Sequence, residues 1–165
     1  MTGWPDQEFD AFVASRLATL VRFAYSLTRD LGLAEDLVQT ALMKSYRASR
    51  RHRLENPEAY VRRAVVTANV SRWRRPHMIE VLVDVVPEPA ADQPSDRLEE
   101  HQTMQGLLRE LTPRQRTVIV LRYQEDWSEA QIADAMGVHV GTVKTLASRA
   151  LDRLRAGALA GRSVL

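Results

Sequence analysis

Cysteine is absent from the chain of 165 residues, so the protein has no disulfide and no thiolate ligand for a metal ion. The four histidines, His52, His77, His101 and His139, are scattered without the spacing of a metal site. No apolar run is long enough to cross a membrane, and the first residues are acidic rather than basic. We therefore expect no membrane span, no signal peptide and a cytoplasmic location.

The motifs of common catalytic and nucleotide-binding sites are missing as well. The sequence contains no GxGxxG, no GxxxxGK[ST], no HExxH and no GxSxG, and without cysteine there is no Cys/His pair. Its Asp and Glu residues are spread over predicted helix faces and a proline-containing acidic segment. We expect a protein without catalytic residues, metal site or cofactor, and hence not an enzyme.

What the chain does contain is an uneven distribution of charge around a small total of +2. Residues 1–75 carry 13 Lys and Arg against 8 Asp and Glu, residues 76–111 carry 2 against 8, and residues 112–165 carry 8 against 5. Two basic blocks that flank an acidic one indicate two polyanion-binding modules. Four prolines between residues 76 and 97 favour a flexible linker there. The predicted organisation is a domain over 1–75, a linker over 76–97 and a domain over 98–165.

The stretch from Trp127 to Leu154 has the pattern of two helices joined by a tight turn. Ser128 can cap the first helix together with Gln131, and Gly137 follows where the turn needs a positive φ. A small Ala133 and an apolar Val143 suit helices that cross closely, as in a helix-turn-helix whose second helix enters the DNA major groove. Opposite its apolar stripe, the second helix carries residues that can bind phosphates or base edges: Thr142, Lys144, Thr145, Ser148 and Arg149. The alternative is an ordinary helical hairpin with a solvated face.

Helical periodicity predicts two amphipathic helices in the first half, from Phe9 to Leu27 and from Ala34 to Ser49, with a break at residues 30–32. Leu17 is among the residues expected to point inward from the first. The outer side of the second helix carries Asp36, Gln39, Thr40, Met43 and Arg47. An exposed Met beside polar residues suits a protein contact, although periodicity alone favours a solvated face.

A third helix is predicted from Pro57 to Arg75, with Asn56 as its N-cap and Val61, Ala64, Val65 and Ala68 as a narrow apolar face. From residue 50 to residue 75 there are eight Arg and two acids. Arg beside Trp73 suits single-stranded nucleic acid, because guanidinium groups bind phosphates while the indole stacks on an unpaired base. For Trp73 alone, a core anchor is the favoured alternative.

The remaining segments complete an all-α prediction of two small helical domains. A helix is expected from Met104 to Leu111, and Thr112 with Pro113 and Gln115 forms a second capping box for the next helix. Residues 79–86 are apolar and β-prone, so they either pack on a domain or form a short strand. The tail over 156–165 is rich in Gly and Ala and is expected to fray.

Three of these stretches resemble conserved regions of bacterial sigma factors. AEDLVQTALMKSYR (34–47) and NPEAYVRRAVVTANVSRWRR (56–75) are similar to the second region, and LTPRQRTVIVLRYQEDWSEAQIADAMGVHVGTVKTLASRALDRLR (111–155) is similar to the fourth. No third domain separates them, which is the layout of the extracytoplasmic-function (ECF) group of the sigma-70 family. The AEDLVQ and GTVK…SRAL motifs resemble those of its actinobacterial, sigma-E-like members.

The resemblance implies a sigma factor that binds core RNA polymerase and directs promoter-specific transcription initiation. The AEDLVQ helix would dock on the β′ clamp helices through Asp36, Gln39, Thr40 and Met43, and the second domain would contact the β flap. The Asn56–Arg75 helix would melt and read the −10 element through Arg62, Arg63, Thr67, Asn69, Arg72, Trp73 and Arg74. The second helix of the helix-turn-helix would read the −35 element through Thr142, Lys144, Thr145, Ser148 and Arg149. The family also admits an anti-sigma factor as a partner.

Some positions depart from the family pattern. Relatives commonly carry Asn where Thr67 stands, a second aromatic residue where Arg72 stands and Ser where His139 stands. Two other classes of function are compatible with the residues. One is a polymerase-independent helix-turn-helix regulator with an N-terminal partner-binding domain, and the other is a nucleic-acid enzyme, which the missing catalytic motifs disfavour.

Overall fold

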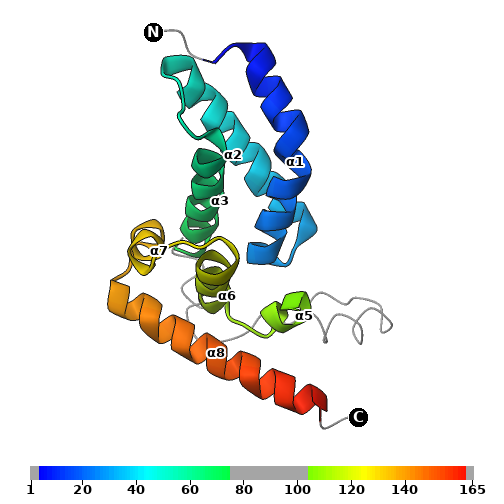
Figure 1. Ribbon diagram of the computed structural model, residues 1–165, viewed down its shortest axis with the longest axis vertical. Helices are drawn as coiled ribbons and strands as arrows, with labels where there is room; N and C mark the ends of the chain where they lie inside the picture. Colours follow the sequence, from blue (N-terminus) through cyan, green and yellow to red (C-terminus); the bar gives the residue numbers. More distant parts are fainter. Residues whose placement is uncertain (1–3, 75–103, 163–165) are drawn as a thin grey trace. The chain divides into compact units, whose positions relative to one another are not determined.

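A computed structural model describes residues 4–74 and 104–162, and every regular element in these two ranges is a helix, which confirms the all-α prediction (Figure 1). The chain divides into two compact units, Met1–Met78 and Ile79–Leu165, which we call the N-terminal and C-terminal domains. The predicted linker over 76–97 and the apolar stretch 79–86 lie outside the described residues. No helix in the described ranges is long and apolar enough to span a membrane.

The N-terminal domain is a three-helix unit made of α1 (Asp6–Thr28), α2 (Leu31–Arg51) and α3 (Pro57–Trp73). Helices α1 and α2 lie side by side in opposite directions, and α3 packs mainly on α2 (Figure 1). Large apolar side chains from all three helices form its core, including Leu20, Leu27, Val38, Val61 and Val65. The periodicity therefore located the core correctly. Leu17 is the exception, because its side chain is 42% exposed.

The break predicted at residues 30–32 is shorter in the structure. Helix α1 ends at Thr28 and is capped by Arg29, which adopts a left-handed conformation with φ 55°, and α2 begins two residues after the cap at Leu31. The carboxylate of Asp30 accepts a hydrogen bond of 3.0 Å from the backbone N–H of Leu33. Asp30 is thus an N-cap that starts a helix, where the sequence pattern predicted only an interruption.

Four aromatic rings close the end of the domain where α1 begins. Trp4 contacts Phe9 and Phe12 edge-on, and Phe9 also contacts Tyr46 of α2 at a centroid distance of 5.2 Å. The Asp6 carboxylate accepts hydrogen bonds from the Tyr46 hydroxyl and from Arg50, at 3.0 and 3.2 Å. Such pairs add to the apolar burial, so the start of the described chain is attached to the last turns of α2.

The C-terminal domain consists of α5 (Met104–Arg109), α6 (Pro113–Ile119), η2 (Val120–Gln124), α7 (Glu129–Met136) and α8 (Val140–Arg162). Helix α8 runs along α5, α6 and α7. The predicted capping box of α6 is present, with Thr112 and Gln115 exchanging backbone and side-chain hydrogen bonds. Helix α6 is followed directly by the π-helical turn η2, in which the Glu125 N–H bonds to the Val120 carbonyl.

The prediction of a frayed tail is wrong over most of its length. Helix α8 continues past Leu154 to Arg162. Gly157 lies where α5 and α8 come close, because a Cβ built on it would be 2.6 Å from the Glu110 Oε2 atom and 3.5 Å from Leu107.

Candidate nucleic-acid interface

Helices α7 and α8 form the predicted helix-turn-helix. Ser128 and Gln131 make the capping box that starts α7, and Gly137 ends it with φ 64°. Beyond this point the N–H of Val138 returns to the Ala133 carbonyl at 3.0 Å, which fixes the turn. Ile132 and Met136 of α7 and Val143 and Ala150 of α8 are buried, and α7 packs on α8. The second helix is therefore held rigidly by its apolar side, as a DNA-reading helix must be.

The opposite side of α8 presents the residues predicted to read DNA. Lys144, Thr145, Ser148 and Arg149 are exposed, whereas Thr142 is half-buried. The Thr145 hydroxyl donates a hydrogen bond of 3.0 Å to the Gly141 carbonyl. Its oxygen can still accept a hydrogen bond, and its methyl group suits contact with a thymine methyl. The Lys144 ammonium lies 3.9 Å from the Glu129 carboxylate.

Gly141 leaves the backbone of the first turn of α8 without a covering side chain at this position. It is exposed, and a Cβ built on it would meet no atom within 4 Å. Its φ is not in the left-handed region, so neither the backbone nor internal packing needs a glycine here, unlike at Gly137. A missing side chain lets another molecule approach the helix backbone closely.

The outer side of α2 is a continuous exposed strip. Asp36, Gln39, Thr40 and Met43 are all exposed, as predicted, and Met43 is 57% exposed. Tyr46 continues the strip by one turn with 37% exposure. The strip combines acidic, amide and adaptable apolar groups, which suits binding to another protein.

Two of the residues predicted to contact DNA from α3 are buried instead. Asn69 is 1% and Trp73 9% exposed, so neither side chain lies on the surface of the N-terminal domain. The reason lies in helical spacing, because positions 66, 69, 70 and 73 share one side and Val66 and Val70 are fully apolar. Trp73 is therefore the core anchor that the alternative interpretation proposed.

The other α3 candidates differ in their surroundings. Arg62 pairs with Glu58 at 3.0 Å and stacks its guanidinium 4.8 Å from the centre of the Phe23 ring, with its side chain only 16% exposed. Glu58 also binds Arg16 of α1 at 3.1 Å. Arg62 thus joins α3 to α1 and is poorly placed to reach DNA. Arg63, Thr67 and Arg74 are exposed, and Arg72 is half-buried.

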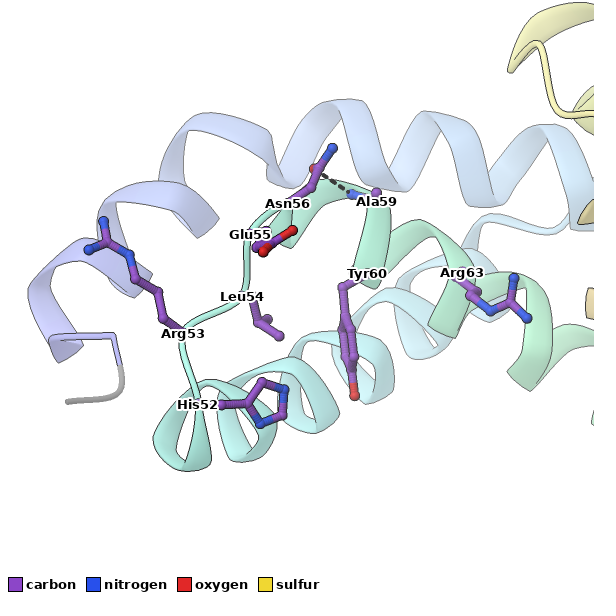
Figure 2. Close-up of a pocket in the computed structure, with 8 residues that line it drawn as sticks. All are labelled: His52, Arg53, Leu54, Glu55, Asn56, Ala59, Tyr60 and Arg63. Carbon is purple, nitrogen blue, oxygen red and sulfur yellow. Dashed lines mark hydrogen bonds between the residues drawn. The ribbon is translucent and has the colours of Figure 1, made fainter. Parts of the chain in front are cut away.

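A pocket of about 500 Å³ lies where the loop after α2 meets the first turns of α3 (Figure 2). It is lined by His52, Arg53, Leu54, Glu55, Asn56, Ala59, Tyr60 and Arg63. Asn56 caps α3 by accepting a hydrogen bond of 3.0 Å from the Ala59 N–H, which fixes the loop against the helix. The Tyr60 side chain is exposed, so its ring is accessible for stacking. Basic, aromatic and hydrogen-bonding groups meet here, as in sites that hold single-stranded nucleic acid.

The described residues hold no group of three or more His, Asp or Glu side chains that could bind a metal ion. The candidate interface residues carry Arg, Lys, hydroxyl, amide and aromatic groups.

Comparison with known proteins identifies the family. Residues 12–77 match the model of sigma-70 region 2, and residues 101–154 match that of sigma-70 region 4. The chain is 36% identical over 151 residues to the RNA polymerase sigma-E factor of Streptomyces coelicolor, covering 90% of this chain and 84% of that protein. It belongs to the sigma-70 family of RNA polymerase sigma factors. It is also 31% identical over 149 residues to the ECF RNA polymerase sigma factor SigM of Mycobacterium tuberculosis, covering 88% of this chain and 74% of that protein.

A solved structure supports the same assignment. The sigma factor RpoE of Bartonella quintana, crystallised with the anti-sigma factor NepR, superposes with a TM-score of 0.61 at 25% identity, over 92% of this chain and 97% of that chain. The expected ECF membership is thereby confirmed, and the sigma factor directs promoter-specific transcription by RNA polymerase. An independent helix-turn-helix regulator is not favoured.

The pocket is the part of the sigma factor's surface that sequence reasoning missed. Tyr60 offered a signal, because it lies off the apolar stripe of α3 and seven residues beyond the run of basic residues over 50–53. The residues predicted to read the −10 element included Trp73, near the other end of α3, and did not include Tyr60.

Proposed function

We propose that the sigma factor divides promoter recognition between its domains, with the N-terminal domain melting and reading the −10 element and the C-terminal domain reading the −35 element. The observation that supports this most strongly is the exposed polar side of α8, set on a rigid helix-turn-helix whose α7 and turn are fixed by caps at both ends.

For the −35 element, the contacts would come from Thr142, Lys144, Thr145, Ser148 and Arg149. Residues near the N-terminus of a recognition helix reach base edges, and Arg and Lys bind guanine O6 and N7 or phosphates. The bare backbone at Gly141 would let α8 sit deep in the major groove.

For the −10 element, we place the capture of an unpaired base in the pocket beside Tyr60. An extruded base loses its stacking, and an aromatic ring can restore part of that free energy. The Arg53 and Arg63 side chains that line the pocket would bind the neighbouring phosphates. Thr67 and Arg74 would extend the contact along α3. Asn69, Arg72 and Trp73 would support α3 from inside the domain.

Core RNA polymerase would bind the exposed strip of α2, with Asp36, Gln39, Thr40 and Met43 against the β′ clamp helices and the C-terminal domain on the β flap. The protein would act in the cytoplasm, where the polymerase works, as an initiation factor without catalytic activity of its own. The Bartonella sigma factor was crystallised with an anti-sigma factor, and we propose a partner of that class for this chain as well.

Run-off transcription with core RNA polymerase and genomic fragments tests the proposal. We expect products that depend on the sigma factor and permanganate-reactive thymines upstream of each start site. Loss of those products on replacing the −35 or the −10 sequence separately would support the division of labour. Products that are insensitive to the −35 sequence would contradict the role given to α8.

A further inference from the structure

Glu129 is an acidic residue next to the predicted DNA-binding side of α8. It is the first residue of α7, and its carboxylate lies 3.9 Å from the ammonium of Lys144 on the exposed side of α8. The Lys144 side chain is 67% exposed and the Glu129 side chain 32% exposed. A carboxylate this close to a DNA-binding face repels phosphates, so it lowers affinity for any duplex.

The ion pair between Glu129 and Lys144 contributes little to the stability of the fold. Pairs between exposed side chains at about 4 Å add almost nothing to stability, because water screens them and ordering long side chains costs entropy. The α7 helix is already started by the Ser128 and Gln131 capping box, and its packing on α8 comes from buried apolar residues. In the first turn of α7 the Glu129 carboxylate interacts favourably with the helix dipole, and it also acts on the Lys144 ammonium 3.9 Å away.

Lysine is a poor reader of sequence when it is unrestrained. Its compact ammonium sits on a flexible four-carbon stem, so it can bind any phosphate within reach, and such contacts carry no sequence information. A carboxylate 3.9 Å away offsets part of the positive charge of the ammonium and so weakens its attraction to phosphates. A base edge with two acceptors, as in guanine O6 and N7, can then compete.

We propose that Glu129 is a positioning residue that acts through Lys144 and raises the sequence discrimination of the −35 contact at the cost of affinity. The inference rests on the proposed function, in which α8 lies in the major groove. It predicts that neutralising Glu129 tightens binding to DNA and makes that binding less selective.

The test uses the full chain assembled with core RNA polymerase and the substitution Glu129→Gln, which keeps size and hydrogen-bonding capacity. Two probes are compared: a promoter obtained by run-off transcription, and a duplex of the same length with a scrambled −35 region. We expect several-fold tighter binding to the scrambled duplex and a smaller preference for the promoter. The plot of log affinity against log salt on the scrambled duplex should steepen by about 0.9, the value for one additional phosphate contact.

Two further variants make the experiment specific. Asp152→Asn removes the same charge from α8 at an exposed carboxylate that pairs only weakly with Arg155, at 3.6 Å. It lies eight residues beyond Lys144, about 12 Å along the helix and more than a Debye length of about 10 Å at 0.1 M salt. We expect this control to leave the preference and the salt slope unchanged. In a Lys144→Gln background, Glu129→Gln should no longer steepen the salt slope.

The outcomes separate the inference from the proposed function. If Lys144→Gln leaves promoter preference intact, the role given to α8 in reading the −35 element loses its support at this residue. If Lys144→Gln lowers the preference but Glu129→Gln changes neither preference nor salt slope, the positioning role of Glu129 is wrong while α8 keeps its function. Two further results would overturn the positioning role of Glu129. One is that Glu129→Gln and Asp152→Asn have equal effects on promoter preference and salt slope. The other is that Glu129→Gln still steepens the salt slope when Lys144 is replaced by Gln.

Discussion

The Nε of Arg116 donates a hydrogen bond of 2.9 Å to the carbonyl oxygen of Leu108, at the end of α5. A second bond, from Nη2 to the Leu111 carbonyl, is 3.1 Å long, and Arg116 is only 7% exposed. The guanidinium thus adds a charged donor to two carbonyls at and just beyond the end of α5. Arg116 therefore joins α6 to the end of α5.

We expect Arg116→Met to destabilise the C-terminal domain by about 2–3 kcal/mol, because the buried carbonyls lose a charged donor. Hydrogen exchange measures this loss of stability, and we expect faster exchange of the α5 and α6 amides, confined to the C-terminal domain. Arg122→Met, at an exposed position of η2, serves as the control and should leave exchange unchanged. Equal exchange rates in both variants would show that the bonds from Arg116 contribute nothing to stability.

Tyr60→Ala should slow promoter opening while leaving the fold intact. The ring is 39% exposed, so its removal empties no core position, but an unpaired base would lose its stacking partner. Stacking of one base contributes about 1–3 kcal/mol, which corresponds to roughly a five- to 150-fold loss in open complex. Permanganate footprinting of the −10 thymines measures the amount of open complex. Tyr60→Phe should retain most of the activity, and a pre-melted −10 bubble should not rescue Tyr60→Ala if the ring holds the base.

The two glycines of the helix-turn-helix should respond in opposite ways to alanine. Gly137→Ala forces a side chain onto a backbone with φ 64° and should cost about 1–2 kcal/mol of stability. Gly141→Ala meets open space and should raise stability by about 0.5–1 kcal/mol. If α8 approaches DNA through its bare first turn, Gly141→Ala should nevertheless weaken promoter binding by the holoenzyme. If Gly141→Ala leaves promoter binding unchanged, the first turn of α8 does not approach the floor of the major groove closely.

Met43→Glu should weaken binding to core RNA polymerase by about tenfold or more, as expected when a charge enters the centre of an interface. Because Met43 is 57% exposed in the chain alone, the fold should be unaffected. Leu17→Glu introduces the same charge at another exposed apolar residue, on α1 and off the α2 strip, and should bind core normally. A fluorescence titration of labelled variants with core enzyme compares the two. Equal losses would mean that the polymerase surface is not confined to α2.

Features encoded by neighbouring residues were predictable from sequence. Asn56 followed by Pro57, and Ser128 followed by Gln131, each fix a helix start within four residues, and both are present in the structure. Asp30 was misjudged because a cap and a break use the same residue types, and only the N–H of Leu33 distinguishes them. The helical spacing of Trp73 with Val66 and Val70 already favoured burial.

The pocket could not be derived in the same way. It exists because the loop over 52–55 folds against the first turns of α3, so that residues from two elements line one space. Nothing in local propensity specifies how that loop lies. Likewise, the exposed residues of α8 could be named from the sequence, but the proximity of Glu129 to Lys144 depends on the angle at which α7 crosses α8.

The wide turn η2 has a consequence for how this chain should be aligned with others. A π-turn accommodates one residue more than an α-turn, and here it comes just before the Trp127 N–H returns to the Leu121 carbonyl. In a relative whose corresponding turn is α-helical, an alignment without a gap would shift every later position by one. On a helix that is a rotation of about 100°, enough to exchange the base-reading side of α8 with its buried side. Promoter preferences should be transferred between family members only after the length of this turn has been checked.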